Sequence, residues 1–161
     1  MVCGWGESDG KCWGENITYQ LACTRAPCSN HLTDCPTDRP APGDDPISLY
    51  AGESSRTGYT RGISHIKKYN AKSESEREGS ALWRHTRDFH GGVKGPDKGV
   101  KDFRMWVRNK WGTPMDRLIS EGHDIGELED SQQEGTVLML NSKSDFIQSK
   151  KVSLEFRQGL N

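Results

Sequence analysis

The sequence predicts a small α/β domain in which a three-stranded, mainly antiparallel sheet is flanked by helices and carries a structural zinc site. Three observations support this prediction. Short segments alternate apolar and polar residues, as strands do, and capped segments with helical spacing lie between them. Two cysteines and two histidines recur at spacings that zinc ligands use. The chain has 161 residues, which is enough for one domain with a real core.

The composition is polar, and this limits the size of the core. Only 32% of the residues are hydrophobic, with 18 Gly and 7 Pro, and the mean hydropathy is −0.85. We therefore expect a modest core with long loops. No apolar run reaches the length of a membrane span, and the N-terminus lacks the apolar region of a signal peptide, so no membrane partner is expected.

The first two strands are predicted at residues 17–23 and 47–51. The first alternates apolar and polar residues and is rich in β-branched types, and the second is a short apolar run. Between them, residues 29–46 contain many Pro and Asp residues, which is typical of a surface loop or insertion. The two strands would pair as a hairpin with a long connection.

A helix is predicted directly after the second strand. Gly52 marks a place where the backbone turns or approaches another group closely. Two serines could cap the helix, and three apolar residues follow at roughly helical spacing (Ser54 and Ser55; Tyr59, Ile63 and Ile66).

This arrangement puts a phenol beside a guanidinium. Tyr50 lies at the strand end, and Arg61 and His65 lie on the helix. Such a pair suits a phosphodiester, because arginine presents a planar fork to phosphate oxygens. A buried tyrosine beside a solvated basic helix explains the same stretch equally well.

The second half of the chain alternates between charged segments and further elements. Residues 70–79 are charged and Ser-rich, and we expect them to be mobile. A short helix is predicted at 80–90, where Ser80 could cap it and the Gly91–Gly92 pair would end it. A basic, Gly-containing loop is predicted at 93–100.

The third strand is predicted at 103–107. Pro114 then precedes a helix that carries Glu121. An acidic loop is expected at 126–135, followed by a short apolar segment, 137–140, that ends at Asn141.

Charge is unevenly distributed, although the formal net charge is only −1. Between Arg56 and Lys72 all charged residues are basic, whereas between Glu121 and Glu134 all are acidic. A basic face with carboxylates elsewhere fits a nuclease, because basic groups hold the DNA backbone and an acid holds a cation. A solvated helix face is the alternative explanation of a charge run.

All five cysteines lie in the first quarter of the chain, and their odd number without a secretion signal favours metal binding over disulfides. Four residues separate Cys23 from Cys28 and His85 from His90, which is zinc-ligand spacing with the histidines about a helical turn apart. Such a zinc ion would join the start of the domain to its middle. Cys35 is the rival ligand, and unremarkable thiols and histidines are the alternative. In the Gly- and Trp-rich arm, 1–16, Cys3 and Cys12 could form part of a zinc knuckle or be free thiols.

The order of these motifs resembles a known nuclease family. Thr18-Tyr19, Tyr50-Ala51-Gly52 and Arg61 resemble the GIY-YIG signature. More narrowly, the chain is similar to the endonuclease domain of Penelope-like retroelements in the segments YQLAC with Cys28, YAGESSRTGYTRGISH, SALWRHTRDFH, RLISEGHDI and LMLNSKSDF. These segments cover residues 17–146 and leave a polar tail, 147–161. The chain departs from the pattern in its ITY and YAG motifs and in its long insertion.

The resemblance implies a set of roles for individual residues. Tyr19 would act as general base or orient the attacking water, and Tyr50 would hydrogen-bond the nucleophile or the scissile phosphate. Arg61 would stabilise the phosphate in the transition state, His65 would assist it, and Glu121 would hold one Mg²⁺ or Mn²⁺. The remaining implied residues are Asn141, which would support the site, and the zinc ligands Cys23, Cys28, His85 and His90.

The implied chemistry is physically coherent. One arginine and one divalent cation address the charge that builds on the phosphate and on the leaving 3′ oxygen. A lone Glu121 is too little for a tight magnesium site, so metal binding should be weak without DNA. Tyrosine is a poor base near neutral pH, so Tyr19 needs Arg61, His65 or the metal close by.

These inferences lead to one main functional hypothesis. The chain would be the metal-dependent DNA endonuclease domain of a retroelement polyprotein, nicking target DNA to leave a 3′ hydroxyl for target-primed reverse transcription. Its partners would be target DNA, the reverse transcriptase domain of the same polyprotein and the element RNA, and it would work in the nucleus. The alternative is a zinc-stabilised module that docks on DNA without cutting it. A repair or homing-type nuclease is disfavoured by the zinc pair.

Overall fold

The computed structural model describes residues 2–3, 11–25, 47–91 and 102–141. The elements in chain order are β1 (Val2–Cys3), the 3-10 helix η1 (Lys11–Trp13), β2 (Ile17–Cys23), β3 (Ile47–Ser54), α1 (Gly58–Tyr69), α2 (Glu74–Glu78), α3 (Ala81–Phe89), β4 (Phe103–Lys110), α4 (Pro114–Gln133) and β5 (Val137–Met139). The segments predicted at 29–46, 93–100 and 147–161 lie outside the described residues, as does half of the arm at 1–16. Within that arm Cys12 is disulfide-bonded. Both expectations for this residue, a zinc-knuckle ligand and a free thiol, are therefore wrong, because a disulfide leaves no thiolate to bind a metal.

The described strands form one mixed sheet in the order β1-β4-β2-β3-β5. The inner strands β4, β2 and β3 are antiparallel, and the edge strands β1 and β5 join them in parallel. The predicted α/β class and the antiparallel hairpin of the first two strands are therefore confirmed. The predicted count of three strands is wrong, because β1 and β5 extend the sheet at its two edges. These two strands were missed because they have only 2 and 3 residues, too few to show an alternating pattern.

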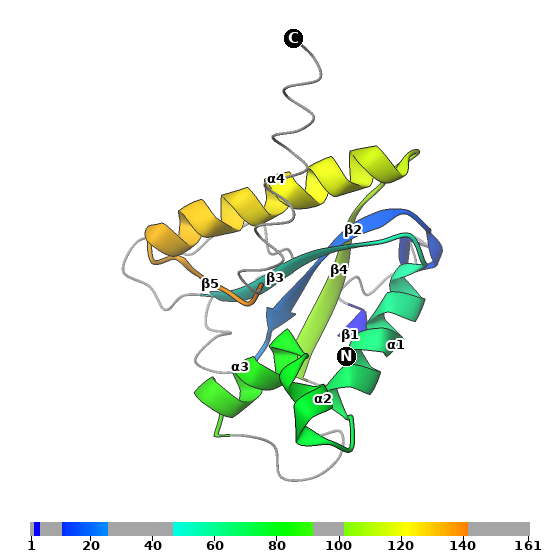
Figure 1. Ribbon diagram of the computed structural model, residues 1–161. Coiled ribbons are helices and arrows are strands. Elements are labelled where there is room, and N and C mark those ends of the chain that lie inside the picture. Colours follow the sequence, from blue (N-terminus) through cyan, green and yellow to red (C-terminus); the bar gives the residue numbers. More distant parts are fainter. Residues whose placement is uncertain (1, 4–10, 26–46, 92–101, 142–161) are drawn as a thin grey trace.

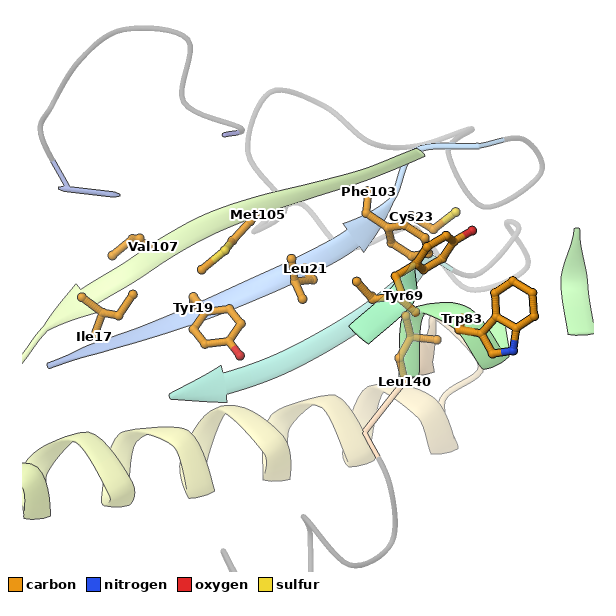
Figure 2. Close-up of a cluster of buried hydrophobic side chains, with 11 residues drawn as sticks. Ile17, Tyr19, Leu21, Cys23, Tyr69, Trp83, Phe103, Met105, Val107 and Leu140 are labelled. Atoms are coloured by element: carbon orange, nitrogen blue, oxygen red, sulfur yellow. The ribbon is translucent and has the colours of Figure 1, made fainter. Parts of the chain in front are cut away.

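Helices cover both faces of the sheet (Figure 1). The helices α1, α2 and α3 lie on one face, and α4 lies on the other. The alternation along β2 explains this arrangement: Tyr19 and Leu21 pack with residues of α1 and α3, whereas Ala22 packs with Ile125 of α4. Every residue of β2 is buried, because a central strand between two helical layers has no solvated face. Figure 2 shows the first of these two cores, which carries Tyr19.

Local capping corrects the predicted start of the central helix. Ser54 still pairs with Ile17 in the sheet, so it cannot begin a helix. The cap is Thr57, whose side chain accepts a hydrogen bond from the backbone of Thr60. Ser80 caps α3 as predicted, and Gly91 follows that helix with a φ of 69°.

Two predicted irregular segments are helical. Residues 74–78 form α2, with Ser73 as N-cap, where a mobile segment was expected. The expected acidic loop at 126–135 is mostly the second half of α4, which runs to Gln133. Ile125 and Leu128 are buried against the sheet, and this packing outweighs the low helix propensity of Gly126. Among the described residues, no helix combines the length and apolar character needed to cross a membrane.

Candidate functional site

The β2–β3 pairing sets two tyrosines side by side. Tyr19 lies opposite Gly52 in the register, and Tyr50, two residues earlier in β3, points to the same face because side chains alternate along a strand. The two rings stack with centroids 6.2 Å apart. In Figure 2 the Tyr19 ring projects from β2 toward β3.

Gly52 leaves the space that Tyr19 occupies. A Cβ atom on Gly52 would lie 2.6 Å from the Tyr19 hydroxyl oxygen and 2.8 Å from Cε1 of Tyr50. Both rings are rigid and packed against other residues, so a larger residue at position 52 would displace them. The sequence-based expectation of a turn or a close approach is thus met by a close approach within the strand.

The helix α1 supplies two partners for the Tyr19 hydroxyl. Arg61 and His65 are four residues apart and therefore share a helix face. Nε of Arg61 donates to the Tyr19 oxygen at 2.8 Å, and Nε2 of His65 lies 2.8 Å from the same oxygen. The His65 ring also packs edge-on against Tyr50, with centroids 5.7 Å apart. Four of the predicted catalytic residues thus form one contiguous cluster.

Burial controls the protonation of Tyr19. Its side chain is 0% exposed, and desolvation raises its pKa well above 10, with further upward contributions from Tyr50 and Glu121. The positive charge of Arg61 and its hydrogen bond act in the opposite direction and are outweighed. Tyr19 therefore stays a neutral phenol near pH 7, although the expected cation is beside it. This protonation state does not support a direct general-base role.

His65 is neutral as well. Burial, together with the positive charges of Arg61 and Lys68, lowers its pKa from 6.5 to about 3. A neutral imidazole can accept a proton, and its low pKa reflects burial first and the neighbouring cations second. Any bound anion that offsets Arg61 and Lys68 would raise the His65 pKa.

Glu121 lies in the other helical layer and acts on this cluster through its charge. It lies on α4 and is partly exposed, and its charge contributes to the raised pKa of Tyr19. One turn earlier, Arg117 forms an ion pair with Glu53 of β3 and donates to Asn16 at 2.7 Å. These contacts fix the first half of α4 over the strand that carries Tyr50. The predicted metal ligand, Glu121, is thus linked to Tyr19 by its charge.

Asn141 acts on the strand rather than on the cleft. Its side-chain oxygen accepts from the Ala51 backbone N–H at 2.9 Å, and its side-chain nitrogen donates to the Ala51 carbonyl at 2.7 Å. The amide thus continues the β5–β3 ladder beyond Met139. It holds the backbone between Tyr50 and Gly52.

A separate group of side chains could hold a metal ion. Cys23, His85 and His90 place one ligand atom each within 4.8 Å of one another. Sγ of Cys23 lies 3.3 Å from Nε2 of His90, which lies 3.2 Å from Nε2 of His85. Around a tetrahedral zinc ion these separations would be roughly 3.5 Å and 3.3 Å, given the usual Zn–S and Zn–N lengths. The predicted fourth ligand, Cys28, and its rival Cys35 lie outside the described residues.

The end of α3 explains how two histidines five residues apart can converge. On a continuous helix they would point about 140° apart. The regular helix ends at Phe89, and His90 has a φ of −124°, so its ring turns back over His85, with centroids 4.9 Å apart. The two therefore meet through the helix C-cap and not by being a helical turn apart.

A polar cleft of about 400 Å³ lies beside the tyrosine cluster, between α1 and α3. Tyr50, Arg61 and His65 line it, whereas Tyr19 does not. The remaining lining residues were not predicted as functional; they are Ser64, Lys68, Gly79, Ser80, Ala81, Leu82 and Arg84. The position of Lys68, seven residues after Arg61 in the acid-free stretch, was the available signal.

None of the protein-family models, curated proteins or solved structures compared with this chain matches it.

Proposed function

We propose that this chain is a divalent-metal-dependent DNA endonuclease of the GIY-YIG type, resembling the endonuclease domain of Penelope-like retroelements. The observation that carries the proposal is the contact cluster of Tyr19, Tyr50, Arg61 and His65 at the edge of an open polar cleft. The sequence resemblance had grouped these four residues, and in the structure two strands and a helix bring them into contact. A fold that needed only a core would have no reason to bury a guanidinium against a phenol there.

The geometry divides the work differently from the roles that the resemblance implies. Tyr50, Arg61 and His65 border the cleft, so they are the groups that touch the substrate. Tyr19 is fully buried and acts as a positioning residue, because its hydroxyl holds both Nε of Arg61 and Nε2 of His65. Arg61 has five N–H donors and uses Nε for Tyr19, which leaves others for the phosphate.

Hydrolysis then proceeds by attack of water on the phosphorus atom. Arg61 binds the phosphate oxygens as their charge increases, and Tyr50 hydrogen-bonds the water or the phosphate. With Nε2–H donating to the Tyr19 oxygen, Nδ1 of His65 accepts the proton of the attacking water. The incoming phosphate makes this easier because it offsets the charge of Arg61, which adds to burial in depressing the His65 pKa. The bond from phosphorus to the 3′ oxygen breaks, and that oxygen leaves with a proton from solvent. The product is a nick with a 3′ hydroxyl.

Two metal ions fit the donor atoms present. Glu121 would hold one Mg²⁺ or Mn²⁺, whose charge would stabilise the leaving oxygen; with one carboxylate, DNA oxygens and water must complete the site. Cys23, His85 and His90 would hold a structural Zn²⁺, because sulfur and imidazole nitrogen are its preferred ligands. The zinc group is built from the strand end and the second half of α3, and none of its three residues lines the cleft.

Cleavage of supercoiled plasmid in Mg²⁺ or Mn²⁺ tests the proposal. Wild type should give nicked circles, and Arg61→Ala and Glu121→Ala should each lower the rate at least about 100-fold, as the loss of a transition-state contact does. Arg56→Ala is the matched control, because Arg56 belongs to the same basic stretch and is exposed. The nicks should also be extended by a DNA polymerase without end repair. Binding without cutting in either metal would refute the endonuclease.

A zinc-stabilised DNA-docking module is the second candidate, favoured by one observation. Tyr19 remains protonated and His65 has a pKa of about 3, so no strong base is ready in the unbound protein. In that case wild type, Arg61→Ala and Glu121→Ala would all bind DNA and none would cut it. The sequence resemblance is the basis for the other parts of the proposal. These are the two proposed partners, a reverse transcriptase domain and element RNA, and a nuclear location.

A further inference from the structure

The cleft beside the tyrosine cluster extends well beyond the groups that the proposed reaction uses. Lys68 lines it from α1 and Arg84 lines it from α3. Neither residue is needed for the steps described above. With Arg61, they give the cleft three cations, and none of the described residues that line it is acidic.

These cations are available for a ligand. Among the described carboxylates, none forms an ion pair with Arg61, Lys68 or Arg84. Arg84 is held in place by donating from Nη1 to the backbone carbonyl of Glu78 at 2.5 Å. This bond orients the guanidinium without neutralising it. A cleft that is lined by three cations and has a volume of about 400 Å³ has room for a phosphate with its attached sugar.

The spacing along α1 relates the cleft to the reaction centre. Arg61, His65 and Lys68 lie at positions i, i+4 and i+7 and therefore on one helix face. At 1.5 Å per residue, Lys68 lies about 10 Å from Arg61 along the helix axis. For a duplex whose axis runs parallel to α1, with a rise of about 3.4 Å per nucleotide, this offset corresponds to about three nucleotides.

We infer that Lys68 and Arg84 form a second phosphate subsite, which binds a backbone phosphodiester of the DNA strand within about three nucleotides of the scissile bond. The inference rests on the proposed function, since it takes Arg61 as the residue at the scissile phosphate. Arg84 provides two N–H groups for phosphate oxygens, and Lys68 provides a mobile point charge. The subsite would position the strand before the reaction.

Salt-dependent DNA binding without a divalent metal tests the subsite independently of cleavage. Each lost phosphate contact should lower the slope of log K against log salt by about 0.9. Lys68→Ala and Arg84→Ala should show this drop and weaker binding. Lys67→Ala is the matched control, because it removes the same charge from the neighbouring exposed position outside the cleft. Equal slopes for Lys68→Ala and Lys67→Ala would overturn the inference.

Methylphosphonates identify the phosphate that binds. Each uncharged linkage is placed in turn on either side of the nick position or, if wild type binds without cutting, along a short bound duplex. At one position the methylphosphonate should weaken DNA binding by wild type and by Lys67→Ala but not by Lys68→Ala. If no such position exists, the DNA subsite is refuted. It is also refuted if Lys68→Ala weakens the binding of inorganic phosphate but leaves the binding of DNA unchanged. If wild type never cuts but this pattern is found, the endonuclease fails and the phosphate subsite stands.

Discussion

The side-chain amide of Asn141 forms two hydrogen bonds with the backbone of Ala51, one in each direction. It reproduces the pairing of a strand residue where β5 has already ended. Because Ala51 lies between Tyr50 and Gly52, this pair fixes the strand at the point where the site is built. A side chain outside the cleft thus controls the position of one within it.

Replacing Asn141 should therefore affect both stability and cleavage. Asn141→Asp keeps the shape and an acceptor for the Ala51 N–H but cannot donate to the Ala51 carbonyl. We expect a loss of about 1–3 kcal/mol in the free energy of unfolding, measured by urea denaturation. Gln132→Ala, which removes an exposed bond to Met139, is the control and should cost less than half as much. Equal losses in the two variants would contradict the proposed strand-fixing role.

Gly52→Ala tests the close approach beneath the Tyr19 ring. The added methyl group would lie 2.6 Å from the hydroxyl oxygen, so Tyr19 must move away from Arg61 and His65. We expect a cost of about 1–3 kcal/mol and a large drop in nicking rate. Gly126→Ala in α4 has nothing within 4 Å and should be neutral or stabilising by up to about 1 kcal/mol. Normal nicking by Gly52→Ala would show that Tyr19 does not position the cluster.

His65 should make stability depend on pH in acid. Its pKa is 6.5 when exposed and about 3 in the folded protein, so between these values the unfolded chain binds the additional proton. The free energy of unfolding should therefore fall as the pH drops from about 6.5 toward 3. Thermal melts of His65→Gln should lose less stability over this range than wild type. His123→Gln, whose parent side chain is 70% exposed, should follow wild type; a wild-type response from His65→Gln would rule out the buried neutral imidazole.

Zinc content tests the Cys23 group. Wild type purified with zinc should hold about one ion per chain by elemental mass spectrometry, and Cys23→Ser and His90→Ala should hold little and melt at lower temperature. The control is His123→Ala, which alters the exposed group of His123, Asp124 and Glu127 on α4. If Cys23→Ser keeps the zinc content of wild type, or if His123→Ala loses as much zinc as Cys23→Ser, the proposed ligands are excluded.

The predicted elements that proved correct are those whose pattern is local. The strand at 17–23 was predicted at its observed bounds because its alternation of apolar and polar residues and its β-branched content lie within the strand itself. Ser80 and Pro114 marked helix starts through capping and backbone geometry that act within one turn. Tyr19, Tyr50, Arg61 and His65 could be grouped because a strand register and one helix suffice to bring them together.

The features that were missed depend on contacts distant in sequence. The continuation of α4 through Gly126 depends on the packing of Ile125 and Leu128 against the sheet. The strand β5 exists because Val137–Met139 finds the free edge of β3, and the capping by Thr57 depends on Ser54 remaining paired in β3. Lys68 and Arg84 line one cleft only because α1 and α3 pack together. The desolvation that keeps Tyr19 protonated also follows from packing and has no local sequence signal.

The register of the β2–β3 ladder has a practical consequence for protein engineering. The chain leaves this ladder after Cys23 and returns at Ile47, at the end remote from the Ile17–Ser54 pair. The ladder hydrogen bonds, rather than the length of the connection, set Tyr19 opposite Gly52. We therefore expect a change in the length of the connection between Cys23 and Ile47 to leave the spacing of the two tyrosines unchanged, which makes this connection the first place to try the insertion of a fluorophore-bearing peptide or an affinity tag.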